Sequence, residues 1–295
     1  MRRIIISLAV LVIATATVYA QNPQAERPAG MREFRMPEKP SDPAFETKEI
    51  TIDSRGMKLY GVAVIPNSGP SRKPAVIMSH GYGGNHIGFY SQMAELAKSG
   101  YVCYAIDFQG GGRGSKSDGS TREMSIFTEK QNLIDVIDAV REWDCVDPDN
   151  LFLLGESQGG CVSAITAPEV KEKITAIALI YPALCIPDDA RALYKTKDDI
   201  PAEITVMGIE IGKAYYENLL DYDIYNVIKD FDKDVLIVHG SNDELVKQRY
   251  SDKAAEIYTH CEYHIIEGAG HGFYGEQKER SNKYVFDFFQ KEIKK

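Results

Sequence analysis

The sequence lacks several features that would point to common classes of protein. Its five cysteines include no C-x-x-C pair and no metal-like spacing, so neither a metal site nor a disulfide framework is predicted. Basic residues are fewer than acidic ones, 34 against 43, which leaves no electrostatic footprint for nucleic acid or an anionic membrane surface. No internal repeat or low-complexity run is visible. The 295 residues with 44% hydrophobic content predict one large globular domain.

Long hydrophobic runs are also scarce, and the one near the start is too short to span a membrane. Arg2 and Arg3 precede an uncharged stretch over residues 4–18, and small residues follow up to Ala20. A bilayer needs about 20 apolar residues, whereas this pattern is typical of a secretory signal peptide. We therefore expect cleavage after Ala20, a periplasmic or secreted protein, and no membrane anchor after cleavage. Loss of residues 1–20 leaves 32 basic residues against 43 acidic ones, a charge near −11.

The organisation of the rest of the chain is regular. Residues 21–45 hold five prolines among charged residues and predict an extended linker before a domain over residues 46–295. A hairpin is expected at 46–53 and 57–66, and helical periodicity is clear at 89–100 and 129–143. Short apolar strands are predicted at 75–79, 101–106, 151–155, 174–181, 235–240 and 262–268. This alternation predicts an α/β fold with a mostly parallel sheet covered by helices on both faces.

One interval in this rhythm is too long for a simple crossover. About fifty residues separate the strands at 174–181 and 235–240. We expect residues 183–226 to form an inserted cap over the carboxyl ends of the strands, where open α/β sheets bind ligands.

Ser157 is the candidate nucleophile. It follows the strand "LFLLG" and precedes a helix that begins Gln158-Gly159-Gly160. The flanking Gly155 and Gly159 allow a close backbone approach at a sharp strand-to-helix turn that exposes the serine hydroxyl. Taken alone, the same pattern also fits a capping serine in a glycine-rich turn.

A serine needs a base and an orienting acid, and the rest of the chain offers both. His271 lies in "EGAGHGF", a glycine-bounded loop after the last strand, and Asp243 follows the strand "VLIVHG". Glu244 is the rival acid. The expected oxyanion donors are the backbone N–H groups of Gln158 and of Tyr82, which lies in "SHGYGG" after another strand. Nucleophile, acid, base and donors agree in type and placement, so Ser157, Asp243 and His271 are predicted to be a catalytic triad.

These motifs resemble those of the α/β-hydrolase superfamily over residues 46–295, and within it those of the bacterial cinnamoyl and feruloyl esterases. The resemblance is carried by "HGYGG", "AIDFQGGGRGSKSDG", "GESQGG", "HGSNDELV" and "EGAGHGF". It implies an α/β-hydrolase fold whose inserted cap binds the phenolic ring of the substrate. By position, Asp189 and Tyr215 would contact ring substituents, with Tyr216 the adjacent alternative to Tyr215. Glu156 departs from the histidine common in those esterases, which bears on substrate identity and not on the reaction.

The expected function is a secreted serine carboxylic ester hydrolase that cleaves feruloyl or hydroxycinnamoyl esters of plant polysaccharide fragments through an acyl-enzyme, with no cofactor. Independently of the resemblance, the cap favours a small aromatic or sugar-linked ester, because it holds thirteen charged residues and five tyrosines. An acetyl esterase acting on hemicellulose stays open. So does a serine aminopeptidase, whose free substrate amine would bind one of Asp188, Asp189, Glu203, Glu210 and Glu217. A non-catalytic binding module is disfavoured because no triad member is missing. The sequence predicts no oligomeric state.

Overall fold

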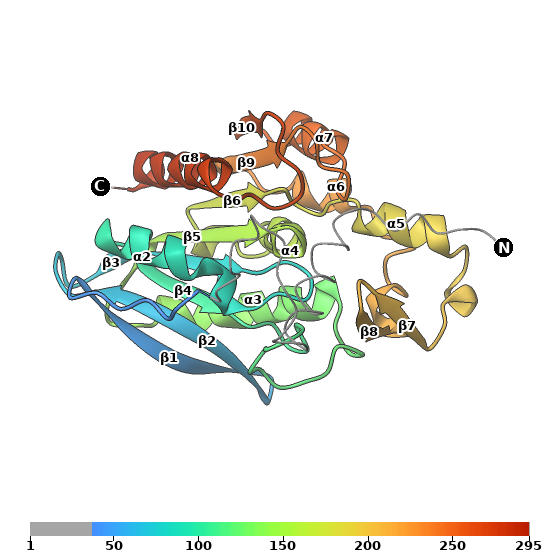
Figure 1. The fold of residues 1–295 in the computed structure, drawn as a ribbon, viewed down its shortest axis with the longest axis horizontal. Helices are drawn as coiled ribbons and strands as arrows, with labels where there is room; N and C mark the ends of the chain where they lie inside the picture. The colour runs from blue at the N-terminus through green and yellow to red at the C-terminus, as the bar shows by residue number, and fades with distance from the viewer. Residues whose placement is uncertain (1–36, 295) are drawn as a thin grey trace, which may run out of the picture. The chain divides into compact units, whose positions relative to one another are not determined.

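The fold is built on an eight-stranded sheet in the order β1-β2-β4-β3-β5-β6-β9-β10 (Figure 1). The computed structural model describes residues 37–294, so the predicted signal peptide and most of the predicted linker lie outside the described residues. The strands are β1 Phe45–Ser54, β2 Met57–Pro66, β3 Lys73–Ser79, β4 Val102–Ile106, β5 Val146–Glu156, β6 Ala176–Ile180, β9 Val235–Gly240 and β10 Cys261–Ile266.

Strand direction changes only at one edge of the sheet. β1 and β2 form the predicted antiparallel hairpin, with Arg55 and Gly56 at positive φ in its turn. β2 also pairs antiparallel with β4, while β4, β3, β5, β6, β9 and β10 run parallel to one another. The prediction of a mostly parallel sheet is confirmed, and the carboxyl ends of its parallel strands share one edge.

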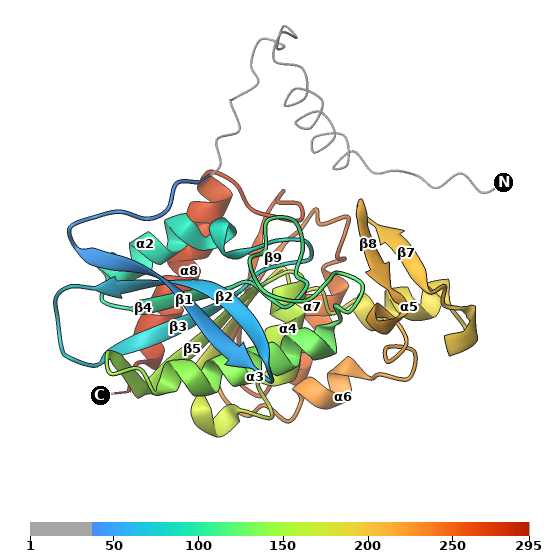
Figure 2. The same cartoon turned by 90° about the horizontal axis from the view of Figure 1, so that it is seen from below.

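Helices cover both faces of the sheet, as the apolar strands predicted. α2 (Tyr90–Lys98) and α8 (Glu276–Glu292) pack on one face, and α3 (Ile126–Arg141), α4 (Gln158–Thr166), α6 (Ile224–Ile228) and α7 (Arg249–Ile257) pack on the other. Side chains alternate between two buried clusters, so Phe152 packs on the α8 side and Leu153 on the α3 side. Seen from below, α2 and α3 lie on opposite sides of the strands (Figure 2).

The long interval between β6 and β9 forms an insertion with its own small sheet. It contains α5 (Ile186–Leu193) and the antiparallel hairpin of β7 (Glu203–Val206) and β8 (Ile209–Gly212), followed by the 3-10 turn η4 (Lys213–Tyr215). α5 and the hairpin stand beyond the carboxyl ends of the parallel strands (Figure 1). Further 3-10 turns are η1 His86–Phe89, η2 Lys171–Lys173 and η3 Lys197–Asp199.

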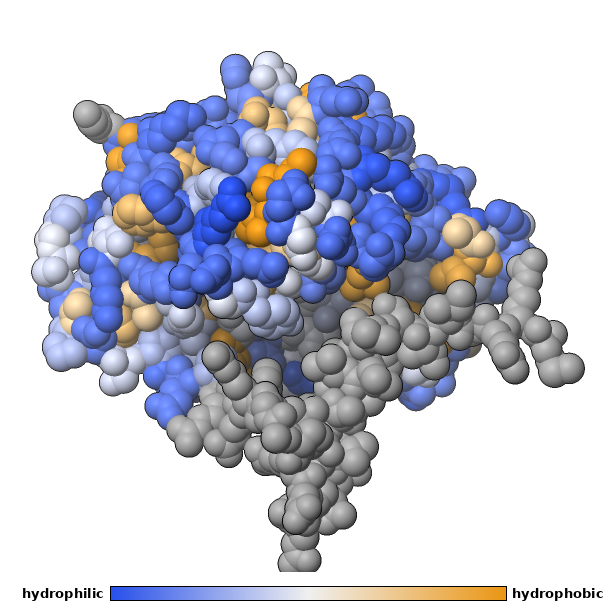
Figure 3. Space-filling view, turned by 45° about the horizontal axis from the view of Figure 1, so that its top comes forward, coloured by the Kyte–Doolittle hydropathy of each residue, from blue (hydrophilic) through white to orange (hydrophobic). Residues whose placement is uncertain are grey.

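The surface of the described chain is largely hydrophilic. Figure 3 shows one face on which apolar residues form small, separate patches. Within the described part of the chain, four large hydrophobic side chains are exposed, namely Leu193, Met207, Leu245 and Tyr274, and the first two belong to the insertion. Among residues 37–294, no helix combines the length and apolar character that a membrane span requires.

Candidate active site

Ser157 occupies a strained turn between β5 and α4. Its φ of 54° and ψ of −118° lie outside the regions that most non-glycine residues adopt. The flanking glycines are required by close contacts. A Cβ on Gly155 would lie 2.3 Å from the carbonyl oxygen of Gly159, and a Cβ on Gly159 would lie 2.1 Å from that of Ser79. The tight packing of α4 against the ends of β3 and β5 therefore holds the serine at the turn that the motif predicted.

The structure brings Ser157, His271 and Asp243 into one hydrogen-bonded chain. Ser157 Oγ lies 2.8 Å from His271 Nε2, and His271 Nδ1 lies 2.8 Å from Asp243 Oδ2. Asp243 and His271 stand in the loops after β9 and β10, and these loops are joined by a bond from Asn242 N to Ala269 O at 2.9 Å. The distances are those of a serine activated by an oriented imidazole.

Asp243 sits in a buried pocket rich in hydrogen-bond donors. Its Oδ1 accepts from the backbone N–H groups of Leu245 and Val246 at 3.0 and 2.8 Å, and its Oδ2 lies 3.3 Å from His239 Nε2. Burial by itself would raise the pKa of Asp243, but the hydrogen bonds from His239 and His271 outweigh it and hold the pKa well below its usual range. The carboxylate beside His271 is thus kept charged. Glu244, the rival acid, is exposed and pairs with Lys247.

The loop after β3 lies directly beside the nucleophile. A Cβ on Gly81 would stand 3.0 Å from Ser157 Cβ and 3.5 Å from its Oγ, so the backbone approaching Tyr82 passes next to the serine. Gln158 is the first residue of α4, and the N–H of such a residue has no partner within its helix. Both predicted oxyanion donors therefore come from segments that adjoin Ser157.

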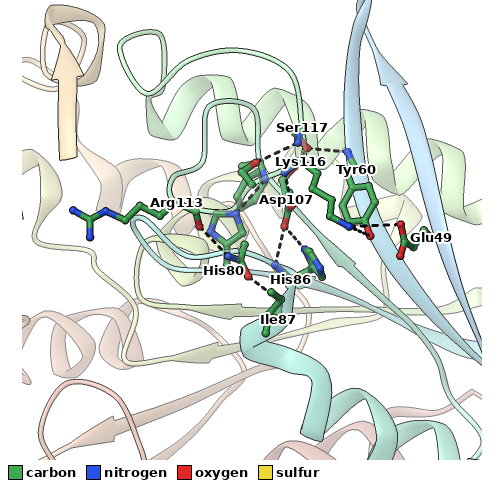
Figure 4. Close-up of polar contacts among 12 residues, drawn as sticks. Glu49, Tyr60, His80, His86, Ile87, Asp107, Arg113, Lys116 and Ser117 are labelled. Atoms are coloured by element: carbon green, nitrogen blue, oxygen red, sulfur yellow. Dashed lines mark hydrogen bonds and ion pairs between the residues drawn. The ribbon is translucent and has the colours of Figure 1, made fainter. Parts of the chain in front are cut away.

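A buried polar cluster fixes this loop against the loop after β4 (Figure 4). Asp107 accepts hydrogen bonds from His86, through its backbone N–H and its Nδ1, and from the backbone N–H of Lys116. His80 Nε2 accepts from the N–H of Phe108 at 3.1 Å, so its Nδ1 carries the proton and donates to Gly81 O at 2.8 Å. Burial lowers the pKa of His80, which keeps it in this neutral form. The cluster anchors the backbone on both sides of Gly81.

The two predicted substrate contacts fall in different settings. Asp189 lies on α5 and is exposed. Tyr215, in η4, is buried, and its hydroxyl donates to Gln158 Oε1 at 2.6 Å. The Tyr215 hydroxyl thus has a partner within the protein, and a role for either residue in binding substrate stays a prediction.

Three residues near the site carried no readable signal in the sequence. Glu129, in the first turn of α3, is buried and accepts both its side-chain hydrogen bonds from Gln158 Nε2. Tyr181, just after β6, has a φ of 37°, and its ring centroid lies 4.9 Å from that of His271. His86, the first residue of η1, is buried and its Nδ1 bonds to Asp107 at 2.7 Å. Only the three-dimensional packing gives these residues their partners. No cluster of metal-ligating side chains occurs within the described residues.

Comparison with known proteins shows that this chain is similar to hydrolases. The profile of a family described as serine aminopeptidase, S33, matches residues 70–208. Monoglyceride lipase of Rattus norvegicus is 23% identical over 206 residues, which are 68% of this chain and 64% of that protein. Monoglyceride lipase of Mus musculus is 28% identical over 160 residues, or 52% of this chain and 49% of that protein. The chain thus spans about half to two thirds of the length of these relatives.

Solved structures match over a larger share of the chain. Est1E from Butyrivibrio proteoclasticus, with ferulic acid bound, matches with a TM-score of 0.75 and 27% identity. The match covers 83% of this chain and 100% of the Est1E chain. The α/β hydrolase GrgF from Penicillium sp. sh18 matches with a TM-score of 0.68 and 18% identity, over 84% of this chain and 99% of the GrgF chain. At this identity the match shows a shared fold alone. The predicted α/β-hydrolase fold is confirmed.

Proposed function

We propose that this chain, a member of the α/β-hydrolase superfamily, is a secreted serine carboxylic ester hydrolase that cleaves feruloyl or related hydroxycinnamoyl esters. The observation that carries the serine hydrolase assignment is the hydrogen-bonded chain from Ser157 through His271 to a buried, charged Asp243. The expected substrates are small esters of plant polysaccharide fragments. Secretion rests on the sequence of residues 1–20.

The reaction follows from the proton path in this geometry. His271 Nε2 takes the proton of Ser157 Oγ as the oxygen attacks the ester carbonyl carbon, and the N–H groups of Tyr82 and Gln158 stabilise the oxyanion. The ester C–O bond then breaks, the alcohol leaves with the proton from His271, and an acyl-serine remains. A water then attacks the acyl carbon while His271 takes one of its protons, the bond from that carbon to Ser157 Oγ breaks to release the acid, and His271 returns the proton to Oγ. Asp243 orients the ring and stabilises its charged form.

The substrate class rests on two supports. A solved structure of Est1E has ferulic acid bound. Est1E is 27% identical to this chain in an alignment that covers 83% of this chain. The insertion is rich in charged residues and tyrosines, which suits a substrate with an aromatic face and hydroxyl groups better than a long acyl chain. Exposed Asp189 on α5 is the proposed partner of a ring hydroxyl.

Replacement of the nucleophile tests the reaction. Ser157→Ala should lower kcat on an aryl ester by several orders of magnitude, since only binding and the oxyanion donors remain. Ser163→Ala is the matched control, because Ser163 lies in the same helix and its buried hydroxyl has no partner among residues 37–294. Labelling by a fluorophosphonate should occur in the wild type and the control and be absent in Ser157→Ala. A Ser157→Ala protein that stays active and is still labelled would contradict the assignment of Ser157 as the nucleophile.

A second candidate acts on a different ester. The monoglyceride lipases of rat and mouse are similar to this chain in sequence. In addition, Leu193 and Met207 expose apolar surface on the insertion. A panel of methyl ferulate, an aryl acetate, a monoacylglycerol and an aminoacyl-arylamide would rank the candidates. Preference for the monoacylglycerol would replace the feruloyl proposal, and preference for the arylamide would favour the aminopeptidase alternative.

A further inference from the structure

Both residues that supply the proposed oxyanion N–H groups send their side chains to the insertion. The hydroxyl of Tyr82 donates to the carbonyl oxygen of Val206 in β7 at 3.2 Å. The side-chain Oε1 of Gln158 accepts from the hydroxyl of Tyr215 in η4 at 2.6 Å. The rings of Tyr82 and Tyr215 also meet edge to face, with centroids 5.9 Å apart. The insertion therefore contacts both halves of the proposed oxyanion hole.

The side chain of Gln158 is held from a second direction as well. Its Nε2 donates to both carboxyl oxygens of Glu129 in α3, at 2.9 and 2.8 Å. Gln158 and Glu129 are each 1% exposed, and Tyr215 is 6% exposed. A buried amide that loses either partner leaves polar groups unpaired without water to replace them, so these bonds resist rearrangement. Gln158 is clamped between α3 of the main fold and η4 of the insertion.

The position of Gln158 matters because its backbone and side chain serve different parts of the site. The residue begins α4 directly after Ser157, where φ and ψ are already strained. Oxyanion donors act only when they are held about 2.7–3.1 Å from the position where the negative charge develops. A clamp on the side chain removes rotation of the first helical residue and so restricts the place of its N–H.

We propose that Tyr215 and Glu129 are positioning residues, which act through the side chain of Gln158 to hold its backbone N–H in the oxyanion hole. The inference rests on the proposed serine hydrolase function. It adds that the insertion is needed even for turnover of substrates that carry no phenolic ring. On this account the hydroxyl of Tyr215 serves the reaction and not recognition of the phenolic ring.

Tyr215→Phe tests this with ethyl acetate, an ester with no aromatic ring for the insertion to recognise. The expected result is a loss in kcat of about tenfold, less than the loss of a whole oxyanion donor, with KM changed less than twofold. Tyr258→Phe is the control, because Tyr258 is buried and its hydroxyl has no partner in the described part of the chain. It should leave kcat within twofold of the wild type.

A double-mutant cycle separates positioning from general damage to the fold. Gln158→Met keeps the backbone N–H and removes the side-chain hydrogen bonds to Glu129 and Tyr215. If Tyr215 acts through Gln158, Tyr215→Phe should lower kcat in the wild type and have no further effect in the Gln158→Met background.

Glu129 is tested on the other side of Gln158. Glu129→Leu should lower kcat about tenfold. Glu129→Gln has a side-chain oxygen that still accepts from Gln158 Nε2, so its kcat should stay within about threefold of the wild type.

The outcomes distinguish this inference from the function on which it rests. Additive losses in the cycle, no loss for Tyr215→Phe, or a loss confined to methyl ferulate would overturn the positioning role, the last by making Tyr215 a substrate contact. Each of these results leaves a wild type that hydrolyses the acetate and a Ser157→Ala variant that does not. Hydrolysis that survives Ser157→Ala would remove the proposed function itself.

Discussion

Two buried carboxyl groups near Ser157 have opposite surroundings. Asp243, after β9, accepts two backbone N–H bonds and lies against two histidines, and its pKa is held well below the usual range although burial opposes this. Glu129, in α3, accepts only the amide of Gln158, and burial raises its pKa to about 8. One carboxyl group is kept charged and the other is kept largely neutral at pH 7.

The comparison shows that burial does not decide the charge of a carboxyl group by itself. Both side chains are excluded from solvent, with residue exposures of 3% and 1%. The difference lies in the number and charge of the donors that replace water. A charged acid is of use beside a histidine that must become protonated, while a neutral one can hold an amide at low electrostatic cost. The two regions thus match two tasks, support of the base and support of the oxyanion donor.

The largest expected effect comes from removing the charge at Asp243. Asp243→Asn should lower kcat on an aryl ester by about 10³–10⁴-fold, because an amide neither stabilises the protonated imidazole nor selects the same tautomer of His271. Steady-state kinetics measure this directly. Glu244→Gln is the neighbouring control and should keep wild-type kcat. Equal losses in both variants would break the contrast, since general damage to the loop would then explain them.

The next effect concerns the contribution of Glu129 to stability. The pKa of Glu129 is shifted in the opposite direction to that of Asp243. A carboxyl group with a raised folded pKa binds a proton on folding, so its contribution to stability is present below its unfolded pKa and is lost as pH rises toward 8. Glu129→Gln removes this titration. The free energy of unfolding of the variant relative to wild type should therefore increase by about 2–4 kcal/mol between pH 5 and pH 8, at roughly 1.4 kcal/mol per pKa unit.

Urea unfolding at several pH values provides the measurement. Glu169→Gln is a suitable control, because Glu169 is exposed and only pairs with Lys130. The groups facing Glu129 are Gln158, Tyr82, Tyr215 and Cys161, and burial raises the pKa of each of the last three, so they stay neutral over this range. A constant difference between variant and wild type across pH 5–8 would mean that Glu129 is ionised in the folded protein and that the contrast with Asp243 is absent.

A smaller effect is expected at Asp189, an exposed carboxylate on α5. If it pairs with a ring hydroxyl, Asp189→Ala should lower kcat/KM for methyl ferulate by about 1–3 kcal/mol, or roughly 5- to 150-fold, and spare an aryl acetate. Asp198→Ala, at another exposed carboxylate of the insertion, is the control. Parallel losses on both esters would assign Asp189 to the structure of the insertion.

The smallest effect is expected at the outer contacts of the insertion. Arg122 pairs with Glu203 and Glu210 of the hairpin, but its side chain is 56% exposed. Exposed ion pairs contribute about 0–1 kcal/mol and are screened by salt. Arg122→Gln should change the melting temperature by about 2 °C or less, and any change should vanish in about 1 M salt. A larger decrease in melting temperature that persists in salt would show that the ion pairs of Arg122 stabilise the hairpin in addition to the contacts of Tyr82 and Tyr215.

Those features of the fold and the site that depend on local signals could be predicted from the amino-acid sequence. Apolar strands alternating with amphipathic helices predicted the parallel sheet and its covering helices, because side-chain periodicity follows backbone geometry. Glycines around Ser157 and strand-end positions for Asp243 and His271 predicted the three side chains that the structure joins, with the His271 ring 2.8 Å from Ser157 Oγ on one side and 2.8 Å from Asp243 Oδ2 on the other. The length of the interval between β6 and β9 also predicted the insertion.

The contacts that support the site could not be predicted, because they arise from the packing of distant elements. Glu129, in the first turn of α3, has the local pattern of a solvated helix residue, and it is buried only because α3 packs against α4. The bond from Tyr215 to Gln158 joins residues 57 positions apart, across the boundary between the insertion and the main fold. Such partners depend on the order of strands and the packing of helices. Hydrophobic periodicity specifies which face of an element is buried, but not which polar group meets it there.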